Sequence, residues 1–163
     1  MTEKVAKEFK GNVGIFLVAS KLSAMNIIAL TTSRNTKGYD IVALNPETNK
    51  GKGIQVKCAD VLSNKKEDFP VVSALFRTMH EELCKKIICD FVFVDISNIE
   101  QPKFFILSKD EVINIIETNT KVWLARKHRK PPEESNKKIL HTIKRSEIEK
   151  YENNWNQILQ DLL

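Results

Sequence analysis

Two short β-type runs separated by a polar turn constrain the fold of this chain more than any other feature. Residues 39–44 read Tyr-Asp-Ile-Val-Ala-Leu, and residues 53–58 read Gly-Ile-Gln-Val-Lys-Cys. Residues 45–52 between them hold Pro, Asn and Gly and no large apolar side chain, which is typical of a hairpin loop. The sequence therefore predicts a β-hairpin over residues 39–58.

The hairpin predicts a cluster of polar side chains. Side chains alternate between the two faces of a strand, so Gln55 and Lys57 are expected to point the same way. Asp40 leads one face of the first strand, and one register of the hairpin brings it to the same spot. A carboxylate, an amide oxygen and an ammonium group at one spot can hold a divalent cation and steady a polarised water or a phosphate.

This order of residues resembles the PD-(D/E)XK, or restriction-endonuclease-like, nuclease superfamily. The signature stands here as Gly38-Tyr39-Asp40 and Gln55-Val56-Lys57, with Gln55 where the family most often has Glu or Asp. The resemblance implies that Asp40 and the side-chain carbonyl of Gln55 bind Mg²⁺ or Mn²⁺, with the backbone carbonyl of Val56 as a further ligand. It also implies that Lys57 positions the attacking water or stabilises charge in the transition state.

The same residues leave a structural explanation open. Asp40 and Lys57 lie among apolar neighbours in the sequence, and burying such charges is costly unless they are paired or bind a ligand. A buried ion pair between Asp40 and Lys57 is therefore the alternative to a catalytic centre.

The residues before the hairpin predict a helix. Apolar residues recur at three- and four-residue steps over residues 5–25. Gly11 and Gly14 each cost about 1 kcal/mol relative to Ala inside a helix. Either the regular helix begins near Gly11, or the glycines allow a close backbone approach.

Residues 11–22 resemble the first helix of Holliday-junction-resolvase-like members of the superfamily and related small bacterial ones. Those members often carry a metal-binding Glu about where this chain has Ile15. Glu8 lies on the same helix face, and Asn12 lies three residues before Ile15, so both are candidate partners of a metal-bound water. The alternative for each is an ordinary solvated helix residue.

The rest of the chain predicts alternating strands and helices. Strands are expected at residues 27–31, 69–73, 91–96 and 103–107, and helices at residues 75–88 and from Ser108 to about residue 117. Ser108 and Glu111 have the spacing of a capping box. The resemblance covers about residues 11–116, and its fold is α/β, a mixed central sheet flanked by helices in a three-layer restriction-endonuclease-like core.

Positive charge is concentrated in one segment. Residues 121–145 hold nine Lys or Arg residues against Glu133 and Glu134, a net charge of +7, whereas the whole chain has a net charge of +5. Such a segment attracts phosphates without regard to sequence, and Trp123 beside it could stack on a base or anchor the segment. A solvated surface arm is the alternative. The candidate nucleic-acid contacts are Arg34, Lys37, Arg77, Arg126, Lys127, Arg129 and Lys130.

The C-terminal residues 146–163 predict an amphipathic helix that packs on the core or on a second copy, with Ser146 and Glu149 as a second capping box. The length of 163 residues suits a single domain. No apolar run approaches the roughly 20 residues that span a bilayer, and the first residues lack the apolar core of a signal peptide, so a cytoplasmic protein is expected. The three Cys residues are expected to be reduced core thiols.

These observations lead to three hypotheses. The first is a metal-dependent endonuclease that cuts DNA, as a homodimer if it cleaves both strands of a duplex. The second is a catalytically inactive nuclease-fold module that binds nucleic acid or a protein partner. The third is a protein-interaction domain whose basic segment meets an acidic partner.

Overall fold

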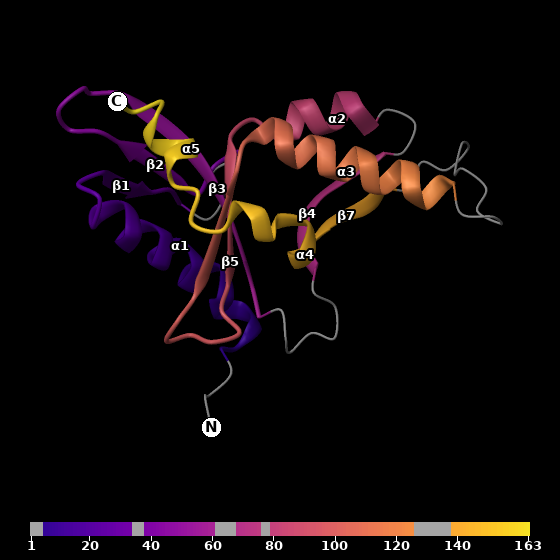
Figure 1. Ribbon diagram of the computed structural model, residues 1–163, viewed down its shortest axis with the longest axis horizontal. Coiled ribbons are helices and arrows are strands. Elements are labelled where there is room, and N and C mark those ends of the chain that lie inside the picture. The colour runs from indigo at the N-terminus through magenta and orange to yellow at the C-terminus, as the bar shows by residue number, and fades with distance from the viewer. Residues whose placement is uncertain (1–4, 34–37, 61–67, 76–78, 126–137) are drawn as a thin grey trace.

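The computed structural model describes residues 5–33, 38–60, 68–75, 79–125 and 138–163. In these ranges five strands form one mixed sheet in the order β1-β2-β3-β5-β6 (Figure 1). The first three strands are an antiparallel meander, β5 runs parallel to β3, and β6 runs antiparallel to β5. Their bounds are β1 Ile28–Thr31, β2 Ile41–Leu44, β3 Gly51–Ala59, β5 Asp90–Asp95 and β6 Lys103–Leu107. The predicted hairpin and the predicted α/β class are confirmed.

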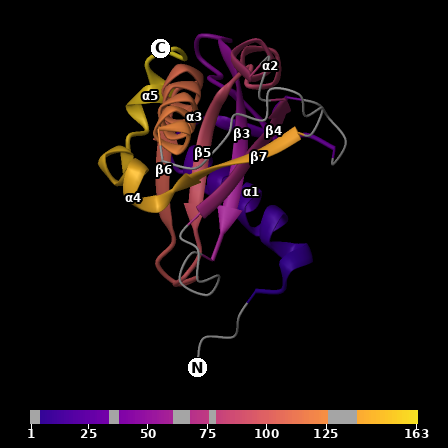
Figure 2. The ribbon, with the colours of Figure 1, turned by 90° about the vertical axis from the view of Figure 1, so that its right-hand side faces the viewer.

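Other elements cover both faces of this sheet. Figure 2 shows a second, two-stranded sheet of β4 and β7 crossing in front of β3, β5 and β6, with α1 behind them. Helices α2 and α3 lie on the side of β4 and β7, and α1 and residues 155–162 lie on the other side. The bounds are α1 Lys7–Ser23, β4 Asp68–Leu75, α2 Met79–Lys86, α3 Lys109–Leu124 and β7 Lys138–Lys144.

The side chains of β5 alternate between the two faces of the sheet, which explains why two cores form. Phe91 and Phe93 point into the core shared with β4, β7 and α3, whereas Val92 and Val94 point into the core shared with α1. All six residues of β5 are buried, as expected for a strand covered on both faces. Because β3 pairs with β5 in parallel register, Gln55 lies beside Phe91 and Lys57 beside Phe93, so both side chains belong to the β4–β7 side.

The helix predicted at residues 75–88 is partly wrong. Leu75 ends β4, where the last three residues of the strand pair with the start of β7, and α2 covers Met79–Lys86.

Strand β7 lies inside the basic segment, residues 121–145, where the charge pattern did not predict a strand. His141 and Ile143 point inward and are buried, and they alternate with Leu140, Thr142 and Lys144, which are exposed or half-buried. Helix α3, opened by the predicted Ser108 capping box, continues to Leu124.

The C-terminal helix predicted at residues 146–163 is present, but as short helical pieces rather than one continuous helix. The chain forms α4 (Arg145–Ile148), a 3-10 turn (Glu149–Tyr151) and α5 (Asn156–Leu159). The break occurs because Asn153 adopts a left-handed φ of 56° and its N–H donates to the Phe104 carbonyl at 2.8 Å. Glu147, not Glu149, accepts from the backbone at the helix start, through Lys144 N–H at 2.7 Å. Trp155, Ile158 and Leu162 are nonetheless buried against the core, as the apolar pattern predicted.

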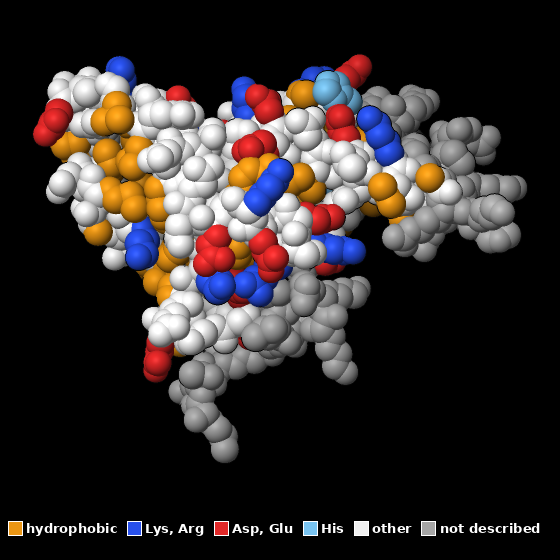
Figure 3. Space-filling model, in the orientation of Figure 1, with side chains coloured by type: hydrophobic (Ala, Val, Ile, Leu, Met, Phe, Trp, Pro, Cys, Tyr) orange, Lys and Arg blue, Asp and Glu red, His pale blue; other side chains and the backbone are white. Residues whose placement is uncertain are grey.

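The surface carries apolar as well as charged side chains. Figure 3 shows hydrophobic side chains gathered on the side of the molecule where β1, β2 and α5 lie, and Lys or Arg interspersed with Asp or Glu elsewhere on that face. The edge strand β1 exposes Ile28 and Leu30.

None of the three cysteines forms a disulfide, and Cys84 is exposed rather than in the core. None of the described helices is both long and apolar enough to cross a bilayer.

Candidate functional site

The backbone of Asp40 is held between two neighbouring segments of the sheet. Its N–H donates to the Ile54 carbonyl of β3 at 2.8 Å, and its carbonyl accepts from the Thr32 N–H at 2.9 Å. The Thr32 hydroxyl also donates to the Tyr39 carbonyl at 3.0 Å. Asp40 therefore occupies a fixed position one residue before β2 begins.

The carboxylate of Asp40 accepts hydrogen bonds from β3 just beyond the last paired residues of β2 and β3. The paired residues of β2 and β3 end at Ile41 and Ile54, and the next residues in that register are Asp40 and Gln55. Asp40 Oδ2 accepts from the Val56 N–H at 2.8 Å and from the side-chain amide of Gln55. The predicted meeting of Asp40 with Gln55 is thus present, and the backbone N–H of Val56 is part of it.

Lys57 lies on the same face of β3, two residues beyond Gln55, and is partly buried. Burial lowers the pKa of the Lys57 ammonium, and the negative charge of the nearby Asp40 carboxylate, with that of Cys89 once it is ionised, opposes that shift. The described residues contain no direct ion pair between Lys57 and Asp40, whose carboxylate is bound by Gln55 and Val56 instead. The alternative of a buried Asp40–Lys57 ion pair is therefore not what the structure contains.

Gly38 and Gly53 leave room for the residues before β2 to lie close to their neighbours. Gly38 has a positive φ of 104°, and a side chain there would meet Ile88 at 2.5 Å. The ring of Tyr39 packs over Gly53, where an added Cβ would lie 3.2 Å from the ring. Gly38, Tyr39 and Gly53 together set the approach of the loop to β3, which gives the Gly-Tyr-Asp order a physical reason.

Cys89 is a neighbour of the site that sequence reasoning missed. Its thiol donates to the Gly38 carbonyl at 3.0 Å, and burial, together with Asp90, raises its pKa to about 11. The contact depends on the parallel pairing of β3 with β5, and it joins residues 51 positions apart in the sequence. No local pattern in the sequence signals such a pairing.

Helix α1 lies across the sheet from Gln55 and Lys57. It packs on the face of β3 that carries Val56 and Cys58, next to Gly14. Glu8 is exposed, Asn12 is partly buried, and neither has a described contact with Asp40. Their role beside a metal stays a prediction without a contact that supports it. The predicted nucleic-acid contacts Arg34, Lys37, Arg77, Arg126, Lys127, Arg129 and Lys130 all lie outside the described residues.

One carboxylate and one amide oxygen are the donor atoms with which the site could hold Mg²⁺. Asp40 supplies one carboxylate, and the described hydrogen bonds of that carboxylate fall on Oδ2, which leaves Oδ1 for a further ligand. The Gln55 carbonyl oxygen could add a second donor. The described residues hold no cluster of three or more His, Cys, Asp or Glu side chains arranged for a metal. Mg²⁺ commonly needs only one or two carboxylates when substrate phosphates complete its coordination.

Comparison of the chain with models of known families, with curated proteins and with solved structures finds no match.

Proposed function

We propose that this chain is a metal-dependent phosphodiesterase of the restriction-endonuclease-like type that acts on DNA, with Asp40, Gln55 and Lys57 as its centre. The observation that carries the proposal is the end of the β2–β3 ladder. There the Asp40 carboxylate accepts from the Gln55 amide and the Val56 N–H. The partly buried Lys57 lies on the same face of β3 as Gln55, and the Asp40 charge acts on the pKa of its ammonium.

Each residue would have a distinct task. Asp40 and the Gln55 carbonyl would hold Mg²⁺ or Mn²⁺, which supplies Lewis-acid polarisation of the phosphate and a more acidic water. The Val56 N–H orients the Asp40 carboxylate. The Lys57 ammonium would stabilise the negative charge that develops on the phosphate oxygens, and its partial burial strengthens that interaction. The basic segment, residues 121–145, would hold the phosphodiester chain.

The test is cleavage of plasmid and branched DNA with Mg²⁺ or Mn²⁺, using the wild type, Asp40→Asn and Lys57→Met. Removing a charge-stabilising group of this kind costs roughly 100-fold or more in rate, so both variants should lose activity. Lys50→Ala is the matched control, because Lys50 is an exposed lysine of the same hairpin. Cleavage that persists in Asp40→Asn would contradict the proposal.

A second function has one observation in its favour. Among the described residues, Asp40 is the one carboxylate with hydrogen bonds to Gln55 and Val56, and a single carboxylate suits weak metal affinity. A nuclease-fold module of this kind would bind DNA without cutting it. Gel-shift titrations at several salt concentrations would then show a steep loss of affinity with salt, and replacing the four basic residues Arg126, Lys127, Arg129 and Lys130 by Gln would flatten that slope.

A further inference from the structure

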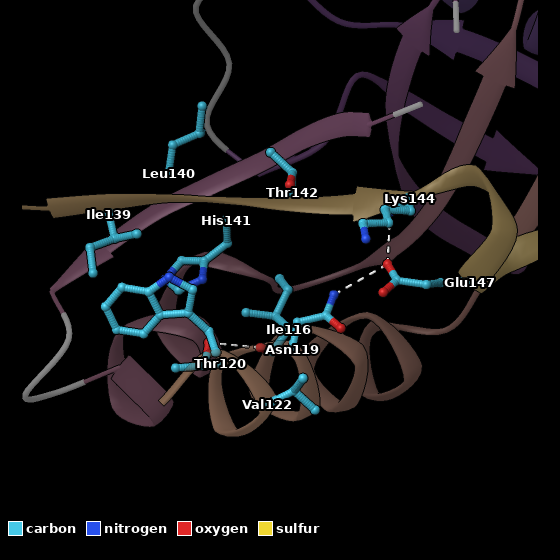
Figure 4. A pocket seen from close by; sticks show the side chains of 11 residues that line it. Ile116, Asn119, Thr120, Val122, Ile139, Leu140, His141, Thr142, Lys144 and Glu147 are labelled. Carbon is cyan, nitrogen blue, oxygen red and sulfur yellow. Dashed lines mark hydrogen bonds between the residues drawn. The ribbon is translucent and has the colours of Figure 1, made fainter. Parts of the chain in front are cut away.

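A cleft between α3 and β7 lies apart from the Asp40 group. Its volume is about 470 Å³, within the roughly 300–1,000 Å³ typical of small-molecule sites. Figure 4 shows His141 and Ile139 reaching from β7 toward α3, and Ile116, Asn119, Thr120 and Val122 on the helix. Trp123, Thr142, Leu140, Lys144 and Glu147 complete the lining.

His141 is the polar group that makes this cleft unusual. The residue is only 8% exposed, and within the described chain its Nε2 is buried without a hydrogen-bond partner. Burial and the nearby Lys86 lower the pKa of His141, so its imidazole is neutral at neutral pH. A buried polar atom without a partner is costly, and native proteins rarely keep one. A ligand in the cleft would supply the missing hydrogen bond.

The other walls restrict what that ligand can be. Ile116, Ile139 and Val122 are aliphatic, and the indole of Trp123 adds an aromatic surface. An aliphatic ligand would leave Nε2 unpaired, and a compact ion would be poorly solvated between such walls. A flat ring with hydrogen-bonding atoms on its edge can pack against the apolar walls and also form a hydrogen bond with the imidazole. Nucleobases are rings of this kind.

The polar end of the cleft is preorganised. The Glu147 carboxylate accepts from Asn119 Nδ2 at 3.2 Å and from the Lys144 N–H at 2.7 Å (Figure 4). These bonds hold the carboxylate in place and tie α3 to the start of α4. Lys144 is exposed, so its ammonium can meet a phosphate attached to a bound base.

We propose that the cleft between α3 and β7 binds a nucleobase, with His141 bonded to the edge of the ring, Trp123 against its face and Lys144 near its phosphate. The base could belong to a free mononucleotide or to an unpaired position in a strand. The site uses none of the atoms of the Asp40 group, so it stands even if the chain does not cut DNA.

Calorimetric titration without divalent metal tests the proposal. The probes are AMP and CMP, a ten-residue single-stranded oligodeoxynucleotide, and an abasic strand of the same length. Binding of the mononucleotides indicates a free nucleotide, and binding of the oligonucleotide alone indicates a base within a strand. Equal affinity for the abasic strand, or no binding of any probe, would overturn the proposal.

Two variants locate the binding. His141→Leu should weaken binding roughly tenfold or more through loss of the hydrogen bond, while the melting temperature stays the same or rises because a buried unpaired atom is removed. Val122→Glu, at a position 54% exposed, should also weaken binding without disturbing the core, by repelling the phosphate. Asn114→Ala, an exposed residue of α3 outside the cleft, is the control. Unchanged binding in both variants would refute the site.

Discussion

Asp40 combines a structural task with a proposed chemical one, and two substitutions separate them. Its carboxylate is the acceptor for the Val56 N–H at 2.8 Å. Asp40→Asn keeps an oxygen for that bond, whereas Asp40→Ala leaves the N–H unpaired and should cost about 1–3 kcal/mol of unfolding free energy. We expect both variants to lose cleavage but only Asp40→Ala to lose this stability. Urea unfolding compares them, and equal loss in both would mean that the charge itself stabilises the fold.

Lys57 should cost the protein stability at neutral pH. Burial lowers the pKa of its ammonium from the ordinary value of 10.5. At pH values below the folded-state pKa both states are protonated, and the folded state bears the whole cost of the buried charge. As pH rises through that pKa, the folded protein releases the proton while the unfolded chain keeps it up to 10.5, so stability rises with pH.

We therefore expect Lys57→Met to be more stable than the wild type at pH 7, by about 1 kcal/mol. The difference should shrink as the pH approaches 10.5. Thermal unfolding of both proteins across this range measures it. A variant less stable than the wild type at pH 7 would show that Lys57 has a partner that stabilises its charge in the fold.

Helix α1 approaches strand β3 closely at Gly14, and this contact defines the packing of the two elements. A Cβ added at Gly14 would lie 2.5 Å from Cys58 Cβ, whereas one added at Gly11 meets nothing within 4 Å. Gly14→Ala should therefore force the helix away and destabilise the protein by about 1–3 kcal/mol. Gly11→Ala should stabilise it by up to about 1 kcal/mol through helix propensity.

Thermal or urea unfolding of these two variants makes a matched comparison, since each adds one methyl group to the same helix. Cys58→Gly in the Gly14→Ala background should restore part of the loss, because the obstructing Cβ is then absent. Equal stabilities for Gly11→Ala and Gly14→Ala would show that α1 packs at a greater distance.

The sequence predicted those elements whose turn or cap residues lie next to each other in the chain. The hairpin has its polar turn within the sequence, and Ser108 and Glu111 sit three residues apart, so β2, β3 and the start of α3 could be predicted. The meeting of Asp40 with Gln55 follows from the same register. Strand β7 could not be predicted from charge, because its partner β4 lies about seventy residues earlier. The C-terminal break could not be predicted either, since it depends on a hydrogen bond from Asn153 to β6.

At the scale of the whole molecule, the C-terminal residues are tied to the turn of the central hairpin. The Leu162 carbonyl accepts from Asn45 Nδ2 at 3.0 Å and from the Thr48 hydroxyl at 2.7 Å. Lys52, at the start of β3, bonds to Asp90 of β5 at 2.7 Å, to the Gln157 carbonyl at 3.1 Å and to Asp161. One lysine thus joins two central strands and the end of the chain.

Lys52 and Lys57 lie five residues apart on one strand and should affect stability in opposite directions at alkaline pH. Burial alone would lower the pKa of Lys52, but its bonds and charges with Asp161 and Asp90 outweigh burial and raise that pKa above 10.5. Its contribution is therefore complete below 10.5 and is lost as pH rises through the folded-state pKa. Lys52→Met should lose about 1–3 kcal/mol at pH 7, because hydrogen bonds to charged groups are worth about that much.

The stabilities of Lys52→Met and Lys57→Met can be compared across one pH range. Between pH 7 and 10.5 the deficit of Lys52→Met should stay constant, while the gain of Lys57→Met declines. Above 10.5 the deficit of Lys52→Met should diminish, since the wild type then loses the proton that holds its strands and C-terminal residues together. Hydrogen exchange on Lys52→Met should show faster exchange in residues 155–163, with β5 and β6 unchanged. Slower or unchanged exchange there would mean that the buried Trp155, Ile158 and Leu162 hold the C-terminal residues without help from Lys52.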